Sequence, residues 1–409
     1  MMKTKNERQN TEEKKIVVEM RLSRLLKNGI CFIILLVVFS SCRGDVEMVL
    51  SEEKQLIPDL RSAKTHVGFY LLNEGNMGTN KSTLDFLDFE KGIYKRNIYA
   101  EINPTVPKEM GDVGNDIGIY GSKLYAVINC SNKIEVMNAR TTKRIGQIEI
   151  PNCRYIKFHN QYAYVTSYAG PVKIDPHYEQ LGYVAKVDTA TLQVVDKCLV
   201  GFQPDELEIV EGKIYVANSG GYMGAGDLKG YERTVSVIDI VTFKEEKRIP
   251  VAWNLHRIKA DKRGNLWVSS RGDYKGYPSR LFFLDKEKQQ VTDTIAVAAT
   301  HYWIDDDLLY VYGAEYSYIN KQEWTFSYGI VDTRTHQVIT KNIITDGTEK
   351  QIEMPYGIMV HPETKDIYIT DAGNFVTPGA LYCFDRYGRM KWKVRAGNIP
   401  AHFVLLPQP

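Results

Sequence analysis

Apolar residues between 66 and 409 fall in short runs that mostly alternate with polar residues and are separated by turn residues. The clearest succession covers 116–120, 123–128, 133–137 and 144–150, with Gly121 and Ser122 between the first two runs. Alternation over about four to eight residues is typical of a β-strand that buries one face. These runs therefore predict four consecutive short strands. No part of 66–409 has a convincing helical period, so we expect an all-β domain.

The same succession returns along the chain, and an Asp or Asn that follows an apolar residue marks each return. The seven positions are Asp88, Asn138, Asp188, Asp239, Asp285, Asp332 and Asp385, spaced 50, 50, 51, 46, 47 and 53 residues apart. A repeat of roughly 40–50 residues with four antiparallel strands is typical of a β-propeller blade. Seven such side chains could indicate metal sites, but Asp at the start of a turn also accepts backbone N–H groups. We interpret them as hairpin corners.

The two ends of the repeat region complete each other. The first repeat begins at what is the second strand of the other repeats, residues 68–72, and the chain ends with an unaccompanied strand pattern at 401–406. A C-terminal strand that completes the first blade would close the ring and leave no open sheet edge. The sequence therefore predicts a seven-bladed β-propeller with four-stranded blades over 66–409.

The N-terminal region has the pattern of a bacterial lipoprotein signal. The apolar run Ile30 to Phe39 is too short to span a bilayer but suits a signal peptide. Basic residues precede the run, and Ser40, Ser41 and Cys42 follow it. We predict a signal peptide over 1–41, with Met20 as the favoured start, and lipidation of Cys42. Residues 42–65 are predicted to be a flexible tether, so the membrane is reached through a lipid anchor only; plain secretion with another cleavage point is the alternative.

Composition limits the chemistry. A formal net charge of +2 over 409 residues gives no electrostatic reason to expect nucleic-acid binding. Apart from Cys31 and Cys42, the cysteines lack zinc-site spacing, and we interpret them as buried free thiols, although a Cys130–Cys153 bridge would also fit. Motifs of nucleophilic, zinc-dependent or phosphate-binding enzymes do not occur, so we expect no catalytic residues, no metal and no cofactor. His256, His301 and His402 stand at three blade junctions and could share a metal only if those blades met around the channel.

The turns of a four-stranded blade alternate between two faces. The Asp corners and the turns after each first strand lie on one face, where we interpret His159, His361 and 305–307 as surface turn residues, with a calcium site at 305–307 as the alternative. The loops after each second strand and the connections between blades lie on the other face, and they hold much of the excess of the 26 Tyr. Loops on a rigid scaffold are where binding residues gather, and aromatic side chains give large contact areas at low entropic cost. This loop face is the predicted site of a sizeable, partly apolar ligand.

Several short motifs resemble one family. Residues 72–76, which read Leu-Asn-Glu-Gly-Asn, 201–204, 220–222, 369–372 and 397–400 are similar to segments of YncE-like seven-bladed propeller lipoproteins of Bacteroidota. The resemblance covers about 68–406 and includes BtuG-type surface lipoproteins. It implies cobalamin capture at the cell surface, a TonB-dependent outer-membrane transporter as partner, and an outer-membrane location.

The candidate ligand-binding residues are chosen by their loop positions: Asn76, Arg154, Tyr168, Tyr222, Arg271, Tyr274, Tyr302, Tyr316, Tyr356 and Asn374. The best-supported function is non-enzymatic binding of a small molecule, with cobalamin as the hypothesis. A propeller that binds a protein or glycan is the alternative, and a propeller lyase comes third. The sequence alone leaves the ligand, the side of display and the oligomeric state open.

Overall fold

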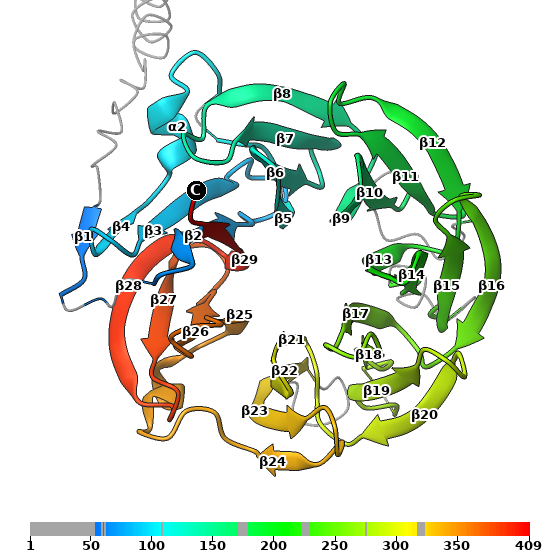
Figure 1. Cartoon of the computed structure of the whole chain (residues 1–409). Coiled ribbons are helices and arrows are strands. Elements are labelled where there is room, and N and C mark those ends of the chain that lie inside the picture. The colour runs from blue at the N-terminus through cyan, green and yellow to red at the C-terminus, as the bar shows by residue number, and fades with distance from the viewer. Residues whose placement is uncertain are drawn as a thin grey trace, which may run out of the picture. The chain divides into compact units, whose positions relative to one another are not determined.

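Seven antiparallel sheets form a ring in the computed structural model (Figure 1). The structure describes residues 54–58, 60, 63–107, 109–170, 179–221, 230–274, 276–316 and 324–409. The predicted signal peptide and Cys42 lie outside these residues. Almost no helix accompanies the sheets, and the prediction of a seven-bladed all-β propeller is confirmed.

We number the blades in chain order and give their strands from the channel outward. Blade 1 contains β29 (Pro400–Pro407), β2 (His66–Asn73), β3 (Thr83–Asp88), β4 (Ile93–Lys95) and β1 (Lys54–Leu56). Blade 2 contains β5 (Gly114–Tyr120), β6 (Lys123–Ile128), β7 (Lys133–Asn138) and β8 (Arg144–Glu149). Blade 3 contains β9 (Cys153–His159), β10 (Tyr162–Ser167), β11 (Tyr183–Asp188) and β12 (Val194–Leu199). Blade 4 contains β13 (Pro204–Val210), β14 (Lys213–Asn218), β15 (Thr234–Asp239) and β16 (Lys244–Pro250); blade 5 contains β17 (Leu255–Ala260), β18 (Leu266–Ser270), β19 (Arg280–Asp285) and β20 (Gln290–Ile295). Blade 6 contains β21 (His301–Asp305), β22 (Leu308–Tyr316), β23 (Trp324–Asp332) and β24 (Val338–Thr340); blade 7 contains β25 (Pro355–Val360), β26 (Ile367–Asp371), β27 (Pro378–Phe384) and β28 (Met390–Asn398).

The C-terminal strand closes the ring as predicted. β29 pairs antiparallel with β2, from His66 opposite Pro407 to Asn73 opposite Pro400 (Figure 1). Phe403 of β29 also packs edge-on against Phe69, with the ring centroids 5.4 Å apart. Closure therefore combines a full ladder of backbone hydrogen bonds with burial of aromatic side chains.

The core is divided into clusters that each join two neighbouring blades. Blades 1 and 7, for example, share a cluster that includes Phe69, Tyr368 and Phe403, and similar clusters follow around the ring. Each blade thus buries both faces of its sheet against its neighbours, as expected for a repeat unit that cannot bury its apolar face alone.

All seven predicted corners are turns of the expected kind. In each, the side-chain oxygen accepts hydrogen bonds from two backbone N–H groups that follow it; Asp188 Oδ1, for example, accepts from Ala190 and Thr191 at 2.9 and 2.8 Å. The Asp305–Asp307 segment, for which a calcium site was an alternative, is held by basic side chains. Lys365 contacts Asp305 and Asp306, and Arg263 contacts Asp307.

The propeller begins earlier than the sequence pattern indicates. Residues from Lys54 belong to blade 1 and not to a tether, because β1 pairs with β4 and Ile57 is buried beside it. Two short helical segments, α2 (Ile98–Ile102) and η2 (Thr348–Gln351), also lie between blades. They are too short to leave a helical period in the sequence. Cys130 and Cys153, for which a bridge was considered, are both free thiols.

The inner strands carry a repeated irregularity at the end that meets the loop face. Every inner strand except β21 shifts register there against its neighbour, as between Leu255 and Ile258 of β17. A β-bulge changes which side of the sheet the following side chains face. The bulges therefore allow adjacent residues, such as His256 and Arg257, to line the same cavity at the mouth of the channel.

The interpretation as surface turn residues was wrong for Asp305 and His361, because both are buried. His361 is fully buried. Its Nδ1 accepts hydrogen bonds from the backbone N–H groups of Glu363 and Thr364, and its ring packs edge-on against His66 and Phe89. A buried imidazole can serve as a turn acceptor only while it is neutral, since protonation of Nδ1 would place a donor against these N–H groups.

This arrangement predicts an acid-sensitive fold. Burial lowers the pKa of His361 to about 4, whereas the unfolded side chain titrates near 6.5. Between these values the unfolded chain binds more protons, so stability falls as the pH falls through this window. We expect His361→Asn, whose Oδ1 can accept the same N–H groups, to reduce the loss of unfolding free energy between pH 7 and 5 by about 2 kcal/mol. Urea unfolding at both pH values measures this, with His159→Asn in the equivalent turn of blade 3 as control; equal pH dependence in wild type and His361→Asn would contradict the account.

Candidate functional site

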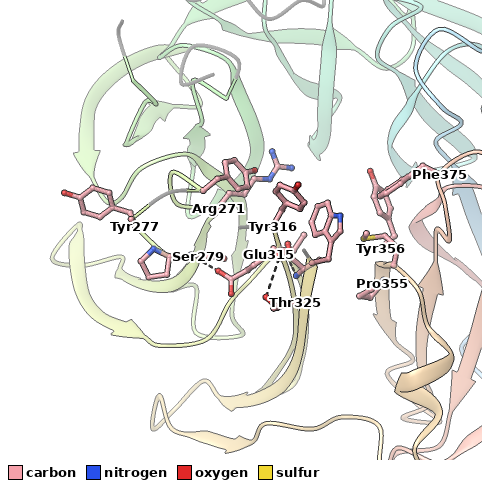
Figure 2. A pocket seen from close by; sticks show the side chains of 16 residues that line it. Arg271, Tyr277, Ser279, Glu315, Tyr316, Thr325, Pro355, Tyr356 and Phe375 are labelled. Carbon is pink, nitrogen blue, oxygen red and sulfur yellow. Dashed lines mark hydrogen bonds between the residues drawn. The ribbon is translucent and has the colours of Figure 1, made fainter. Parts of the chain in front are cut away.

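Two adjoining cavities open on the loop face. The first, which we call the aromatic pocket, has a volume of about 450 Å³ and lies over blades 5, 6 and 7 (Figure 2). The second, which we call the channel-mouth cavity, has a volume of about 290 Å³ and is lined by the starts of the inner strands. Arg271, Thr300 and Tyr356 line both cavities. The two therefore form one continuous recess on the predicted face.

The aromatic pocket is built by the long hairpin of blade 6. β22 and β23 stay paired as far as Tyr316 opposite Trp324, whose rings lie 5.3 Å apart. Tyr356 and Phe375 of blade 7 form the opposite wall, with their ring centroids 6.0 Å apart (Figure 2). Trp324 keeps 44% of its surface exposed, which is high for so large an aromatic side chain. Aromatic groups left open to solvent around a concave recess are typical of a ligand site.

A few polar groups are fixed among these aromatics. Glu315 on β22 accepts a hydrogen bond from the backbone N–H of Ser279 at 3.1 Å, which holds its carboxylate between blades 5 and 6 (Figure 2). Arg271 enters from the side of blade 5. The pocket thus combines apolar walls with one acidic and one basic side chain, which can fix the orientation of a polar ligand.

Below the rim, a buried carboxylate organises three blades. Asp205 at the start of β13 is fully buried. It accepts hydrogen bonds from Tyr168 at 2.7 Å and from His256 Nδ1 at 3.0 Å, and Arg154 pairs with it at 3.2 Å. We call these residues, together with Arg271, the Asp205 cluster.

The charges of the Asp205 cluster follow from its geometry. Burial alone would raise the pKa of Asp205, but Arg154 and the hydrogen bond from His256 outweigh burial and hold this pKa well below its usual range. Burial, with Arg271 and Arg257, lowers the pKa of His256 far below its usual value, so this imidazole is neutral. Its Nδ1–H therefore donates to Asp205, and its Nε2 accepts from Arg271 Nη2 at 2.9 Å. The chain Asp205–His256–Arg271 fixes the guanidinium that both cavities share.

A second carboxylate lies across the channel mouth. Glu74, which follows β2, accepts from the Tyr356 hydroxyl at 2.8 Å and from His402 Nε2 at 2.9 Å. These contacts join blade 1 to blade 7 and to the closing strand. Tyr356 thus presents its ring to the aromatic pocket while its hydroxyl is fixed at the channel.

The structure brings together half of the predicted site residues. Arg154, Arg271, Tyr274, Tyr316 and Tyr356 line one or both cavities. Tyr168 lies beneath them as a hydrogen-bond donor to Asp205, with the Arg154 guanidinium over its ring at 4.8 Å. Tyr222 lies outside the described residues.

Three predicted residues are not part of the recess. Tyr302 is fully buried between blades 5 and 6, and its hydroxyl donates to the carbonyl of Trp267. Asn374 is exposed, and its side-chain oxygen accepts hydrogen bonds from the backbone N–H groups of Val376 and Thr377. Asn76 closes a turn with Thr79 and lines neither cavity.

Sequence reasoning found Arg154 and Arg271 but missed the other charged members of the site. Glu74, Arg257 and Glu315 line the cavities, and none was among the candidates. Asp205, which holds Arg154 and His256 in place, was not among them either. Glu74 sits within the Leu-Asn-Glu-Gly-Asn motif, which was a usable signal. Selection by loop position did not include it.

The described residues contain neither a group of side chains suited to a metal ion nor a helix suited to crossing a membrane. Within those ranges, no group of three or more His, Cys, Asp and Glu side chains could hold a metal ion. His256 and His301 do line the channel-mouth cavity and His402 lies beside it on Glu74, but they do not form such a group. No helix in the part of the chain that the structure describes is both long and apolar enough to cross a membrane.

Comparison with known families places most of the propeller in one of them. Residues 67–395 match the family described as Domain of unknown function (DUF5074). The chain belongs to the DUF5074 family. None of the curated proteins matches its sequence.

Solved structures similar to this DUF5074 protein support the fold. A quinonprotein alcohol dehydrogenase-like protein from Bacteroides thetaiotaomicron matches with a TM-score of 0.56 at 13% identity, over 83% of this chain and 78% of that one. Hydrazine synthase from Kuenenia stuttgartiensis matches with a TM-score of 0.51 at 16% identity, over 67% of this chain and 76% of that one. Structural similarity at such low sequence identity shows a shared propeller fold and does not indicate a shared function.

Proposed function

We propose that this DUF5074 protein is a non-enzymatic binding protein of the cell envelope that captures a corrinoid, such as cobalamin, at the aromatic pocket. The observation that carries the proposal is the recess itself. Tyr316, Trp324, Tyr356 and Phe375 surround it, and a few fixed polar groups lie among them. Its volume of about 450 Å³ falls within the range of roughly 300–1,000 Å³ that is typical of small-molecule sites.

The chemistry of a corrinoid matches this recess. A corrinoid has a broad ring with an apolar rim and polar amide arms. The aromatic walls suit the rim, and the Glu315 carboxylate and Arg271 guanidinium suit amide groups as acceptor and donor. An edge of the ligand would enter the pocket while the rest of it lies across the loop face.

The envelope setting rests on the N-terminal pattern and on the resemblance to BtuG-type lipoproteins. A lipidated Cys42 would tether the propeller to the outer membrane at the cell surface. From there it would pass its ligand to a TonB-dependent transporter. Rim residues that stay exposed, such as Tyr277, would be available for a contact with that partner.

Titration calorimetry of residues 54–409 with cyanocobalamin tests the proposal. We expect one-to-one binding, and we expect Tyr316→Ala and Trp324→Ala to lower the affinity at least about tenfold, because aromatic anchors in a pocket dominate binding energy. Tyr387→Ala is the matched control, since Tyr387 is 60% exposed at the corner of Asp385 on the opposite face. Absence of heat at micromolar protein, or an equal loss in the control, would contradict corrinoid capture at this pocket.

A further inference from the structure

The channel-mouth cavity contains a buried cation that pairs with no carboxylate of the residues that the structure describes. Arg257 on β17 is only 5% exposed and lines the cavity. Its Nε is buried without a hydrogen-bond acceptor in the described part of the chain. One contact of its guanidinium is the face of the Tyr155 ring, at 4.8 Å. Arginine is almost never buried in this way unless a partner completes it.

The carboxylates around the channel-mouth cavity accept hydrogen bonds from other donors. Glu206 holds Lys259 at 2.7 Å and accepts the backbone N–H of Ile258 at 3.0 Å. Asp116 accepts the backbone N–H of Ile156 at 2.9 Å. Glu74, across the cavity, is held by Tyr356 and His402. Glu206 and Asp116 act on the charge of Arg257 at a distance, but they do not fill its hydrogen-bonding positions.

His301 adds a second incomplete group beside it. His301 is 7% exposed, lines the same cavity, and has a buried Nδ1 without a hydrogen-bond partner in the described residues. Burial, and then the charges of Arg257 and Lys259, lower the pKa of His301 well below its usual value. A neutral imidazole can still donate one N–H, so Arg257 and His301 together offer donors and positive potential to one occupant.

We propose that the channel-mouth cavity is an anion subsite, in which Arg257 and His301 bind the carboxylate or phosphate group of the ligand. Because Arg271, Thr300 and Tyr356 also line the aromatic pocket, a single ligand with an apolar ring and an anionic group fills both cavities. The inference that the ring of the ligand lies in the aromatic pocket rests on the proposed function. The inference that an anionic group lies in the channel-mouth cavity rests on Arg257 and His301 alone.

Four small probes separate the two halves by calorimetry on residues 54–409. Phenyl phosphate and phenylacetate carry a ring and an anion, benzyl alcohol carries a ring only, and inorganic phosphate carries an anion only. We expect at least one ring-bearing anion to bind about tenfold or more tighter than benzyl alcohol, because a hydrogen bond to a charged group is stronger than one between neutral groups. The tighter of phenyl phosphate and phenylacetate identifies which anion the subsite prefers. Competition by inorganic phosphate is expected to remove this advantage.

Variants then locate the subsite. Arg257→Gln and His301→Gln are each expected to reduce the advantage of the ring-bearing anion and to leave benzyl alcohol binding unchanged. Arg248→Gln is the control, because Arg248 is exposed on β16 and pairs with Glu245. If Arg257→Gln does not fold by circular dichroism, His301→Gln and phosphate competition on the wild type decide the question.

The results distinguish the two proposals. Equal affinity for anionic and neutral probes, or an anion advantage that survives both substitutions, would overturn the anion subsite. The protein could bind phosphate through Arg257 and bind neither cyanocobalamin nor benzyl alcohol. That result would support the anion subsite and contradict ligand binding at the aromatic pocket.

Discussion

Deleting residues 400–409 is expected to abolish cooperative folding. The deletion removes β29, so β2 loses the partner of its whole length and blade 1 loses its inner strand. It also removes Phe403 from the cluster shared by blades 1 and 7, and Leu406 from the one shared by blades 1 and 2. An opened ring would expose a long apolar edge, and the lost contacts exceed the roughly 5–15 kcal/mol that separates folded from unfolded domains.

Soluble yield and thermal unfolding by circular dichroism measure this effect. The control is deletion of Gln408 and Pro409, which lie beyond β29 and contribute a single backbone hydrogen bond, from Gln408 to Thr65. That control should lose at most about 1.5 kcal/mol. A chain without β29 that still melts in one transition near the wild-type temperature would contradict closure by the terminal strand.

Asp205→Asn is expected to lower the free energy of unfolding by about 3–5 kcal/mol, the second-largest effect that the structure predicts. Asparagine can still accept from Tyr168, but it removes the buried negative charge that Arg154 and Arg271 contact. The loss is therefore that of a buried carboxylate beside two guanidinium groups. Because the pKa of Asp205 is held below its unfolded value, its contribution is present above about pH 4 and is lost only as the pH falls further.

Urea unfolding of wild type and variant between pH 5 and 8 measures the size of the effect and its constancy above about pH 4. The difference should be constant over this range, because Asp205 stays ionised in the folded protein throughout. Asp196→Asn, on exposed strand β12, is the matched control and should change stability by no more than about 0.5 kcal/mol. A change below about 1 kcal/mol for Asp205→Asn would show that the arginines do not depend on this carboxylate.

The fold could be predicted because its signals are local. Alternation within each strand and an Asp or Asn at each corner depend on residues a few positions apart, and all seven corners have the expected hydrogen bonds. Ring closure was also predictable, since an incomplete first repeat and a surplus last strand can be counted in the sequence.

The site was less predictable because strand registers and long-range contacts decide it. Tyr302 and Tyr356 occupy similar places near the start of an inner strand. β25 has a register shift between Pro355 and Ile358, and Tyr356 lines the cavities, whereas β21 pairs without a shift and Tyr302 packs between blades. A one-residue shift reverses the side that a side chain faces, and no local sequence signal marks it.

Contacts between distant residues explain the groups that sequence reasoning missed. Glu74 is placed by Tyr356 and His402, which lie 282 and 328 positions away in the chain. Asp205 likewise acts through residues of blades 3 and 5. Such clusters exist only once the blades have packed against one another, so residue type and loop position could indicate the face but not the pairing.

A crystal structure of residues 54–409 grown with saturating cyanocobalamin tests the central claim most directly. The account predicts ligand density against Tyr316, Trp324 and Tyr356, with a polar contact to Arg271. Density on the face of the Asp corners, or an empty recess at saturating ligand, would contradict it.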